Sequence, residues 1–159
     1  MQSGDIMETN KSLTAILKEH IGEEKTTEWI EVTQERINNF ADCTGDHQYI
    51  HVDIEKAKNG PFGRTIAHGF LTLSLIPAFS YTISFIPPGM NITAVNYGLN
   101  KVRFINPVPS GSKVRDAIKL SGVEEKENGR ILMTMTHTIF IEGVEKPALI
   151  AETLGLIIT

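Results

Sequence analysis

The sequence predicts an α+β fold in which an antiparallel sheet wraps around one long central helix. Two observations lead to this prediction. Residues 65–100 contain no Asp, Glu, Lys or Arg, and residues 66–85 within them are apolar nearly all round, as expected of a fully buried helix. After Pro87-Pro88-Gly89 the apolar residues change from a helical to an alternating spacing, which is typical of strands.

Short elements precede the central helix. Thr33 and Asp53 are suitable N-caps, because their side-chain oxygens can accept a hydrogen bond from the first turn of a helix. Gly22 and the run Asn59-Gly60-Pro61 are typical helix stops. The predicted elements are a helix over 12–21, a strand over 27–32, a helix over 34–42 and a short helix from Asp53 to Lys58.

The second half of the chain predicts strands. From Ile131 to Ile141 the residues alternate as in a strand, so that every second side chain lies on the same face. Asn128-Gly129 just before this segment is a strong signal for a hairpin turn. We therefore expect a four- or five-stranded antiparallel sheet within a single domain over residues 1–159, with about the first ten residues flexible. The predicted strands are 92–100, 101–105, 113–123, 130–141 and 147–158.

Composition excludes several classes of protein. The chain has 15 Lys and Arg against 19 Asp and Glu, and this net charge of −4 gives no reason to expect a nucleic-acid partner. Cys43 is the only cysteine, which excludes an intrachain disulfide and a cysteine-based zinc cluster. The first 20 residues show no basic start followed by an apolar run, so we expect no signal peptide and a cytoplasmic protein.

The uncharged block raises the question of a membrane span. Residues 66–86 are nearly long enough to cross a bilayer. However, they contain His68, Pro77 and several hydroxyl side chains, and they lack a basic flank beside a clean apolar core. A buried helix is therefore expected, and no membrane span.

A carboxylate and an imidazole lie close together in the segment before this helix. Asp46 and His51 would point about 140° apart on a helix, because they are five residues apart. A turn after Gly45 would let them converge on one water molecule, as in a general acid–base pair. The same spacing also fits an Asp–His hydrogen bond that only braces a loop.

The start of the central helix is a second candidate. Backbone N–H groups in a first helical turn have no intrahelical partner, and Gly69 would let a carbonyl oxygen approach them closely. A small residue needed for packing explains the same glycine. Chemistry that uses both elements is polarisation of a thioester carbonyl together with addition of water at the β-carbon.

Two motifs resemble those of a known family. The run Thr44-Gly45-Asp46-His47-Gln48-Tyr49-Ile50-His51, followed by Ala67-His68-Gly69, is similar to the signature of hydratase 2, the MaoC-like (R)-specific enoyl-CoA hydratases. The nodulation-protein-N-like single-domain subgroup is the most similar. The strand candidate over 96–104 and the following Pro107-Val108-Pro109 also fit it, so the resemblance runs from about residue 28 to the C-terminus.

The resemblance implies a hot-dog fold and a role for each motif residue. Asp46 and His51 would be the catalytic pair that activates water and delivers a proton to the α-carbon on the same face. The Gly69 backbone N–H would be the oxyanion donor. Where the family usually has Asn-Pro between the pair, this chain has Gln48-Tyr49, which puts the substrate preference in doubt more than the activity.

The resemblance also implies partners. The substrate would be an acyl-CoA thioester, the chain a homodimer, and no metal or redox cofactor would be needed, since coenzyme A is part of the substrate. Gly45, His68, Asn100 and Arg103 are candidate substrate-binding residues, although Asn100 and Arg103 can equally pair across strands. Seven cations are candidates for the coenzyme phosphates: Lys56, Lys58, Arg64, Lys101, Arg103, Lys113 and Arg115.

Other interpretations stay open. Asp42, Asp46, His47 and His51 have the donor types of a carboxylate–imidazole metal site, against which the resemblance argues. Cys43 is expected to be a buried, inert thiol. An acyl-CoA thioesterase on the same fold is a rival function, disfavoured because the central helix has no carboxylate. A non-catalytic acyl-binding or signalling module is another.

Overall fold

The computed structural model describes residues 11–158. The predicted flexibility of residues 1–10 lies outside the described residues. Two N-caps are confirmed, since the side chain of Thr33 accepts a hydrogen bond from the backbone N–H of Arg36 and that of Asp53 from Lys56. The helices before the central element are α1 (Leu13–Glu19), α2 (Gln34–Thr44), α3 (Tyr49–Val52) and α4 (Ile54–Lys58).

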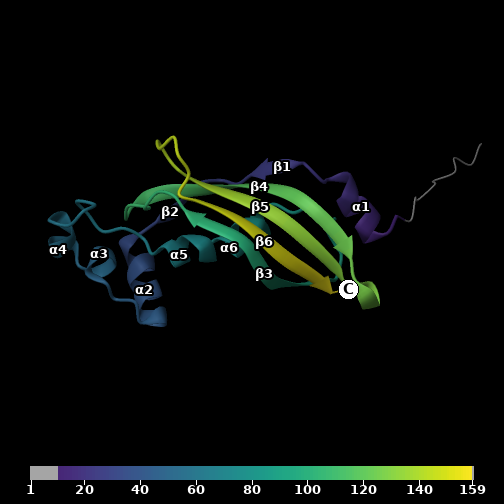
Figure 1. Cartoon of the computed structure of the whole chain (residues 1–159), viewed down its shortest axis with the longest axis horizontal. Coiled ribbons are helices and arrows are strands. Elements are labelled where there is room, and N and C mark those ends of the chain that lie inside the picture. Colours follow the sequence, from purple (N-terminus) through teal and green to yellow (C-terminus); the bar gives the residue numbers. More distant parts are fainter. Residues whose placement is uncertain (1–10, 159) are drawn as a thin grey trace, which may run out of the picture.

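All the strands form one antiparallel sheet in the order β1-β4-β5-β6-β3, with β2 also paired to β4. The hairpin between β4 and β5 turns at Asn128, whose φ of 59° is one that asparagine tolerates well. The sheet curves around the central helices, while α2, α3 and α4 gather at one end of the molecule (Figure 1). The strands are β1 (Glu24–Thr26), β2 (Ile30–Val32), β3 (Thr93–Phe104), β4 (Ser112–Glu125), β5 (Ile131–Ile141) and β6 (Leu149–Ile158).

Two strand predictions were wrong in their boundaries. Of the strand expected over 27–32, only β2 at 30–32 is formed, and β1, which was not predicted, precedes it at 24–26; the chain leaves β4 after β1 and rejoins it at β2. The two strands expected over 92–100 and 101–105 are one continuous strand, β3, whose pairing with β6 shifts register at two irregular positions instead of breaking. The sheet thus has six strands instead of four or five.

The central helix is shorter than predicted and is divided in two. It consists of α5 (Gly69–Ser74) and α6 (Ile76–Thr82), which meet at Leu75. Pro77 explains the break, because a proline has no N–H to donate to the carbonyl of Leu73 one turn earlier. The residues before Gly69 are extended, and Ile66 forms an isolated bridge with Pro109.

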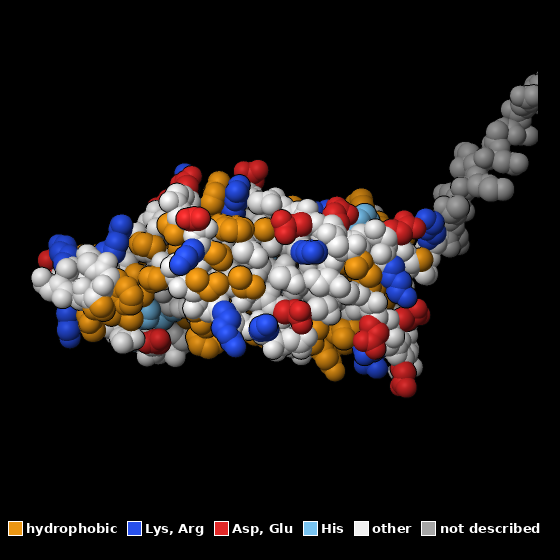
Figure 2. Space-filling view, turned by 45° about the horizontal axis from the view of Figure 1, so that its top comes forward, with side chains coloured by type: hydrophobic (Ala, Val, Ile, Leu, Met, Phe, Trp, Pro, Cys, Tyr) orange, Lys and Arg blue, Asp and Glu red, His pale blue; other side chains and the backbone are white. Residues whose placement is uncertain are grey.

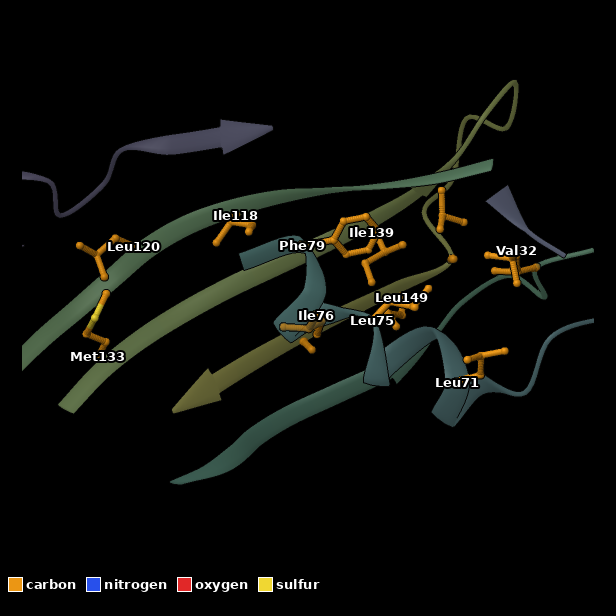
Figure 3. Packing of buried hydrophobic residues seen from close by; sticks show 14 of the residues in the cluster. Val32, Leu71, Leu75, Ile76, Phe79, Ile118, Leu120, Met133, Ile139 and Leu149 are labelled. Atoms are coloured by element: carbon orange, nitrogen blue, oxygen red, sulfur yellow. The ribbon is translucent and has the colours of Figure 1, made fainter. Parts of the chain in front are cut away.

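The core lies between this divided helix and the concave face of the sheet. Leu75 and Phe79 lie beside Leu149 and Ile139 of the sheet (Figure 3), and Leu71 belongs to the same buried cluster. All five side chains are buried. Burial on the sheet side alternates along β5, as its sequence predicts. The prediction that the uncharged block is core is confirmed for Leu71, Leu75 and Phe79.

The outer face of the sheet has a different composition. Lys, Arg, Asp and Glu side chains alternate across the face in Figure 2, without a large region of one sign. Within the described residues, no helix is both long and apolar enough to cross a membrane.

Candidate active site

The first site element is the sharp turn that ends α2. Gly45 caps the helix with φ of 80°, a conformation that glycine adopts without strain, and its N–H donates to the Ala41 carbonyl at 2.8 Å. The turn brings Asp46 out of the helical path. One carboxylate oxygen of Asp46 accepts the Gln48 N–H at 3.3 Å, and the side chain is more than half exposed. Asp46 is thus fixed by its backbone, with the carboxylate open to a ligand.

The second element is α3, which carries His51. The imidazole is 7% exposed, and its Nδ1 lies 2.7 Å from the Ile66 carbonyl oxygen. Because a carbonyl only accepts hydrogen bonds, Nδ1 carries the proton, and Nε2 of the neutral ring keeps a free lone pair. The backbone pairs at the same place, since the Ile66 N–H donates to the Ile50 carbonyl at 2.9 Å. His51 therefore has the tautomer that a general base requires at Nε2.

His68 is the third member of the site. Its ring stacks on that of His51, with 3.8 Å between centroids and 25° between planes, and the Phe40 ring lies tilted to it at 5.0 Å between centroids. Its Nε2 donates to the Asp46 carbonyl oxygen at 2.9 Å, while its Nδ1 is buried without a partner. His68 thus links the Asp46 backbone to the His51 ring.

These three residues meet in space. One side-chain donor atom from each of Asp46, His51 and His68 lies within 4.8 Å of the other two. The convergence predicted for Asp46 and His51 by way of the Gly45 turn is therefore seen in the structure.

Gln34 supports the site, and no sequence signal pointed to it. Its side-chain amide donates to the His51 carbonyl at 2.7 Å and accepts from the Thr65 hydroxyl at 2.6 Å. It thereby joins the start of α2 to both segments that hold His51. A glutamine at the first position of a helix is common, so only the tertiary contact distinguishes it.

Gly69 begins α5, and its N–H has no acceptor within the helix. Gly69 and His51 line one pocket of about 400 Å³, together with Phe70, Phe104 and other apolar residues. A Cβ added at Gly69 would lie 3.0 Å from the Phe104 ring, so the position also has a packing reason to be glycine. Both interpretations of Gly69 therefore find support.

Electrostatics favours a neutral His51. Burial lowers the pKa of His51 below its ordinary value of 6.5. The hydrogen bond to the Ile66 carbonyl and the charge of Asp46 oppose this shift in pKa, whereas His68 adds to it. The imidazole is thus available as a base at neutral pH.

The other candidates lie elsewhere. Asn100 donates to Glu152 at 2.7 Å across the β3–β6 pair, and Arg103 donates to the Val102 carbonyl, so neither is brought to the pocket of His51. His47 pairs with Asp42 at 2.9 Å on the surface, and this contact raises the pKa of His47. Of the four residues in the metal alternative, Asp46 and His51 come together, with His68 as their third member instead of Asp42 or His47.

Cys43 is exposed, so the prediction of a buried thiol was wrong. The residue lies near the end of α2, on the side away from its two buried residues, Ile37 and Ala41. Helical position decides burial here, and Cys43 follows the polar face.

The chain is similar to several known proteins. The family model described as the MaoC-like domain matches residues 17–140. The 3-hydroxyacyl-thioester dehydratase Z of Mycobacterium tuberculosis is 48% identical over 147 residues, which cover 92% of this chain and 94% of that protein. Nodulation protein N of Rhizobium leguminosarum is 45% identical over 133 residues, or 82% of this chain and 81% of that protein.

Solved structures agree on the fold. A monoamine oxidase regulatory protein from Archaeoglobus superposes with a TM-score of 0.75 and 28% identity, over 86% of this chain and 89% of that one. The (R)-hydratase from A. caviae involved in PHA biosynthesis superposes with a TM-score of 0.69 and 22% identity, over 85% of this chain and 94% of that one. The sheet wrapped around α5 and α6 is thus the hot-dog fold, and the chain belongs to the MaoC-like dehydratase family of hydro-lyases.

Proposed function

We propose that the chain is an (R)-specific enoyl-CoA hydratase, which interconverts a trans-2-enoyl thioester and an (R)-3-hydroxyacyl thioester. The observation that carries the proposal is the convergence of Asp46, His51 and His68 beside the pocket that His51 shares with Gly69. The family and the name of its mycobacterial relative, a 3-hydroxyacyl-thioester dehydratase, support the same reaction.

The reaction proceeds by acid–base chemistry on one face of the substrate. A water molecule between the Asp46 carboxylate and Nε2 of His51 gives a proton to His51, and its oxygen adds to the β-carbon of the enoyl group. The pair then returns a proton to the α-carbon from the same side. No net proton is gained or lost by the enzyme, and the reverse sequence removes water.

Gly69 acts on the thioester carbonyl. Addition at the β-carbon places negative charge on the carbonyl oxygen, and the free N–H at the start of α5 is a donor for that charge. A side chain at Gly69 would press on the Phe104 ring, which packs beside this donor.

The proposal includes no metal and no redox cofactor. The stacked rings of His51 and His68 support this, because lone pairs lie in the ring planes and two nearly parallel rings 3.8 Å apart do not aim at one ion. In addition, Nδ1 of His51 and Nε2 of His68 are already engaged by backbone carbonyls.

A homodimer formed through β3 is also part of the proposal. β3 is an edge strand of the sheet and is 12 residues long. Val95, Tyr97 and Leu99 on it are exposed, and a long apolar edge without a partner favours aggregation. Pairing with β3 of a second copy would join the two sheets. Sedimentation should then give twice the chain mass of 17.6 kDa, and a monomer at micromolar concentration would contradict this part of the proposal.

The decisive assay is hydration of crotonyl-CoA, followed by loss of the enone absorbance. The expected product is (R)-3-hydroxybutyryl-CoA, identified by chiral chromatography, without release of free thiol. Thiol release without hydration would show that the protein is a thioesterase. Tight binding without turnover would show that it is a binding module. The same assay on crotonyl–acyl carrier protein compares the two thioester carriers, and we expect the CoA ester to be the better substrate.

A further inference from the structure

A second group of Asp, His and hydroxyl side chains crosses the core face of the sheet. Nδ1 of His137 on β5 lies 2.7 Å from a carboxylate oxygen of Asp116 on β4, and Nε2 of His137 lies 3.1 Å from the Thr153 hydroxyl on β6. Asp116 and His137 are both 0% exposed. These three residues, here called the sheet relay, lie in a row across neighbouring strands.

Stability alone is a weak reason for the sheet relay. A buried ion pair or polar pair costs desolvation, and apolar residues of similar size are often as stable in its place. The second carboxylate oxygen of Asp116 has no hydrogen-bond partner, so the group is not even fully satisfied. The neighbours on this face, such as Ile118 and Ile139, show that the surrounding core is apolar.

The relay ends at a cavity. Thr153 lines a pocket of about 500 Å³ between the central helix and the strands β3 and β6, whereas Asp116 and His137 do not reach it. The helix side of that pocket begins at Leu73 of α5, one turn after Gly69. The two pockets share no lining residue, so the proposal needs an acyl chain that starts at a thioester beside Gly69 and runs along the central helix into this pocket.

Thr153 is the relay's contact with the pocket. A hydroxyl offers one donor and two acceptor positions, and His137 uses only one of them. If Nε2 of His137 carries a proton, the Thr153 proton is free to point into the pocket; if not, the Thr153 oxygen is free to accept. In either case one hydrogen-bonding position remains for a ligand. Two other hydroxyls of the wall, Ser74 and Ser80, already donate to helix carbonyls at 2.6 and 3.0 Å.

We propose that Thr153, oriented by His137 and Asp116, is a specificity residue that selects acyl chains with a hydroxyl group beyond the β-carbon. A hydroxyl can both donate and accept, so it fits Thr153 in either state of His137. A plain alkyl chain would cover the Thr153 hydroxyl and leave its free hydrogen-bonding position unpaired, which lowers the affinity for that chain. This inference rests on the proposed function for the direction of the acyl chain.

Binding tests the inference without requiring turnover. Octanoyl-CoA and octanoyl-CoA derivatives with a single hydroxyl at each carbon beyond the β-carbon are saturated, so they cannot be hydrated. Calorimetry should show that one hydroxylated ester binds about tenfold more tightly than octanoyl-CoA. Thr153→Val should remove that preference, and Thr153→Ser should retain it. The matched control is Thr136→Val, because Thr136 bonds Ser121 on the opposite face of the sheet.

Thermal unfolding of each variant shows whether it is folded. If Thr153→Val is unfolded, the test uses Thr153→Ser. Equal affinity for all the esters, or a preference that survives in Thr153→Val, would overturn the inference. Hydration of crotonyl-CoA is measured in parallel. Hydration without a binding preference overturns the inference alone, whereas a binding preference without hydration supports it and overturns the proposed function.

Discussion

The molecule contains two groupings of Asp and His that differ in what surrounds them. Asp46 and His51 come from a turn and a short helix and lie close together without bonding one another, and His51 lines a pocket. Asp116 and His137 come from neighbouring strands and face each other at 2.7 Å without exposure. The carboxylate of Asp46 is more than half exposed, whereas one oxygen of the buried Asp116 carboxylate pairs with His137 and the other has no partner. We propose the first grouping for catalysis and the second for holding the Thr153 hydroxyl from within the core.

The comparison leads first to a prediction for catalysis. His51→Ala should lower kcat for crotonyl-CoA hydration by about 10³ to 10⁴, since general acid–base catalysis contributes up to about that factor. Its effect on stability should be small in comparison. Circular dichroism and the urea midpoint check the fold. Turnover within a few fold of the wild type would remove His51 from the chemistry.

The opposite result is expected for the buried pair. Asp116→Ala should lower the free energy of unfolding by about 3–5 kcal/mol, because it leaves His137 buried without its partner. Urea unfolding at constant pH measures this change. A loss below about 0.5 kcal/mol would mean that the pair contributes little to the fold. The matched surface variant, Asp42→Ala, removes an exposed Asp–His contact and should change stability by less than about 1 kcal/mol.

A smaller effect is expected from the residue that supports the open pair. Gln34→Ala removes the hydrogen bond to the His51 carbonyl and the one from Thr65. We expect kcat to fall about tenfold with little change in KM, because the base is less well positioned while the substrate contacts remain. Glu35→Ala, next to it on the exposed side of α2, is the control. An unchanged kcat in Gln34→Ala would show that Gln34 does not position His51.

The mildest test is the pH profile. Because the pKa of His51 is lowered, its neutral form persists to pH values below 6.5, and activity is lost only as the pH falls through that lowered pKa. The acid limb of kcat/KM should therefore have an apparent pKa below 6.5. An acid limb centred above pH 7 would contradict the burial effect on His51.

Much of this arrangement was predictable from local sequence signals. The caps at Thr33 and Asp53, the hairpin at Asn128 and the turn at Gly45 all depend on conformations that the residues themselves prefer. The resemblance to the family motifs then identified Asp46 and His51 as a pair. Such features need only a few neighbouring residues to be specified.

Features that depend on distant contacts were not predictable. The alternation in β5 predicts only that His137 faces the core. The pairing of β5 with β4 and β6 is what brings Asp116 and Thr153 beside it. Gln34 likewise acts through segments that lie 17 and 31 residues away. The length of the central helix was overestimated because apolar character predicts burial, while Pro77 decides where the helix is divided.

The most direct test of the open pair is the hydration of crotonyl-CoA by Asp46→Asn. This change keeps the size of the side chain and an oxygen that can accept the Gln48 N–H, and removes only the carboxylate. The wild type should form (R)-3-hydroxybutyryl-CoA, and the variant should unfold at the same temperature with kcat lower by about 10³. A folded Asp46→Asn variant that hydrates crotonyl-CoA at a rate near that of the wild type would contradict the catalytic role of Asp46.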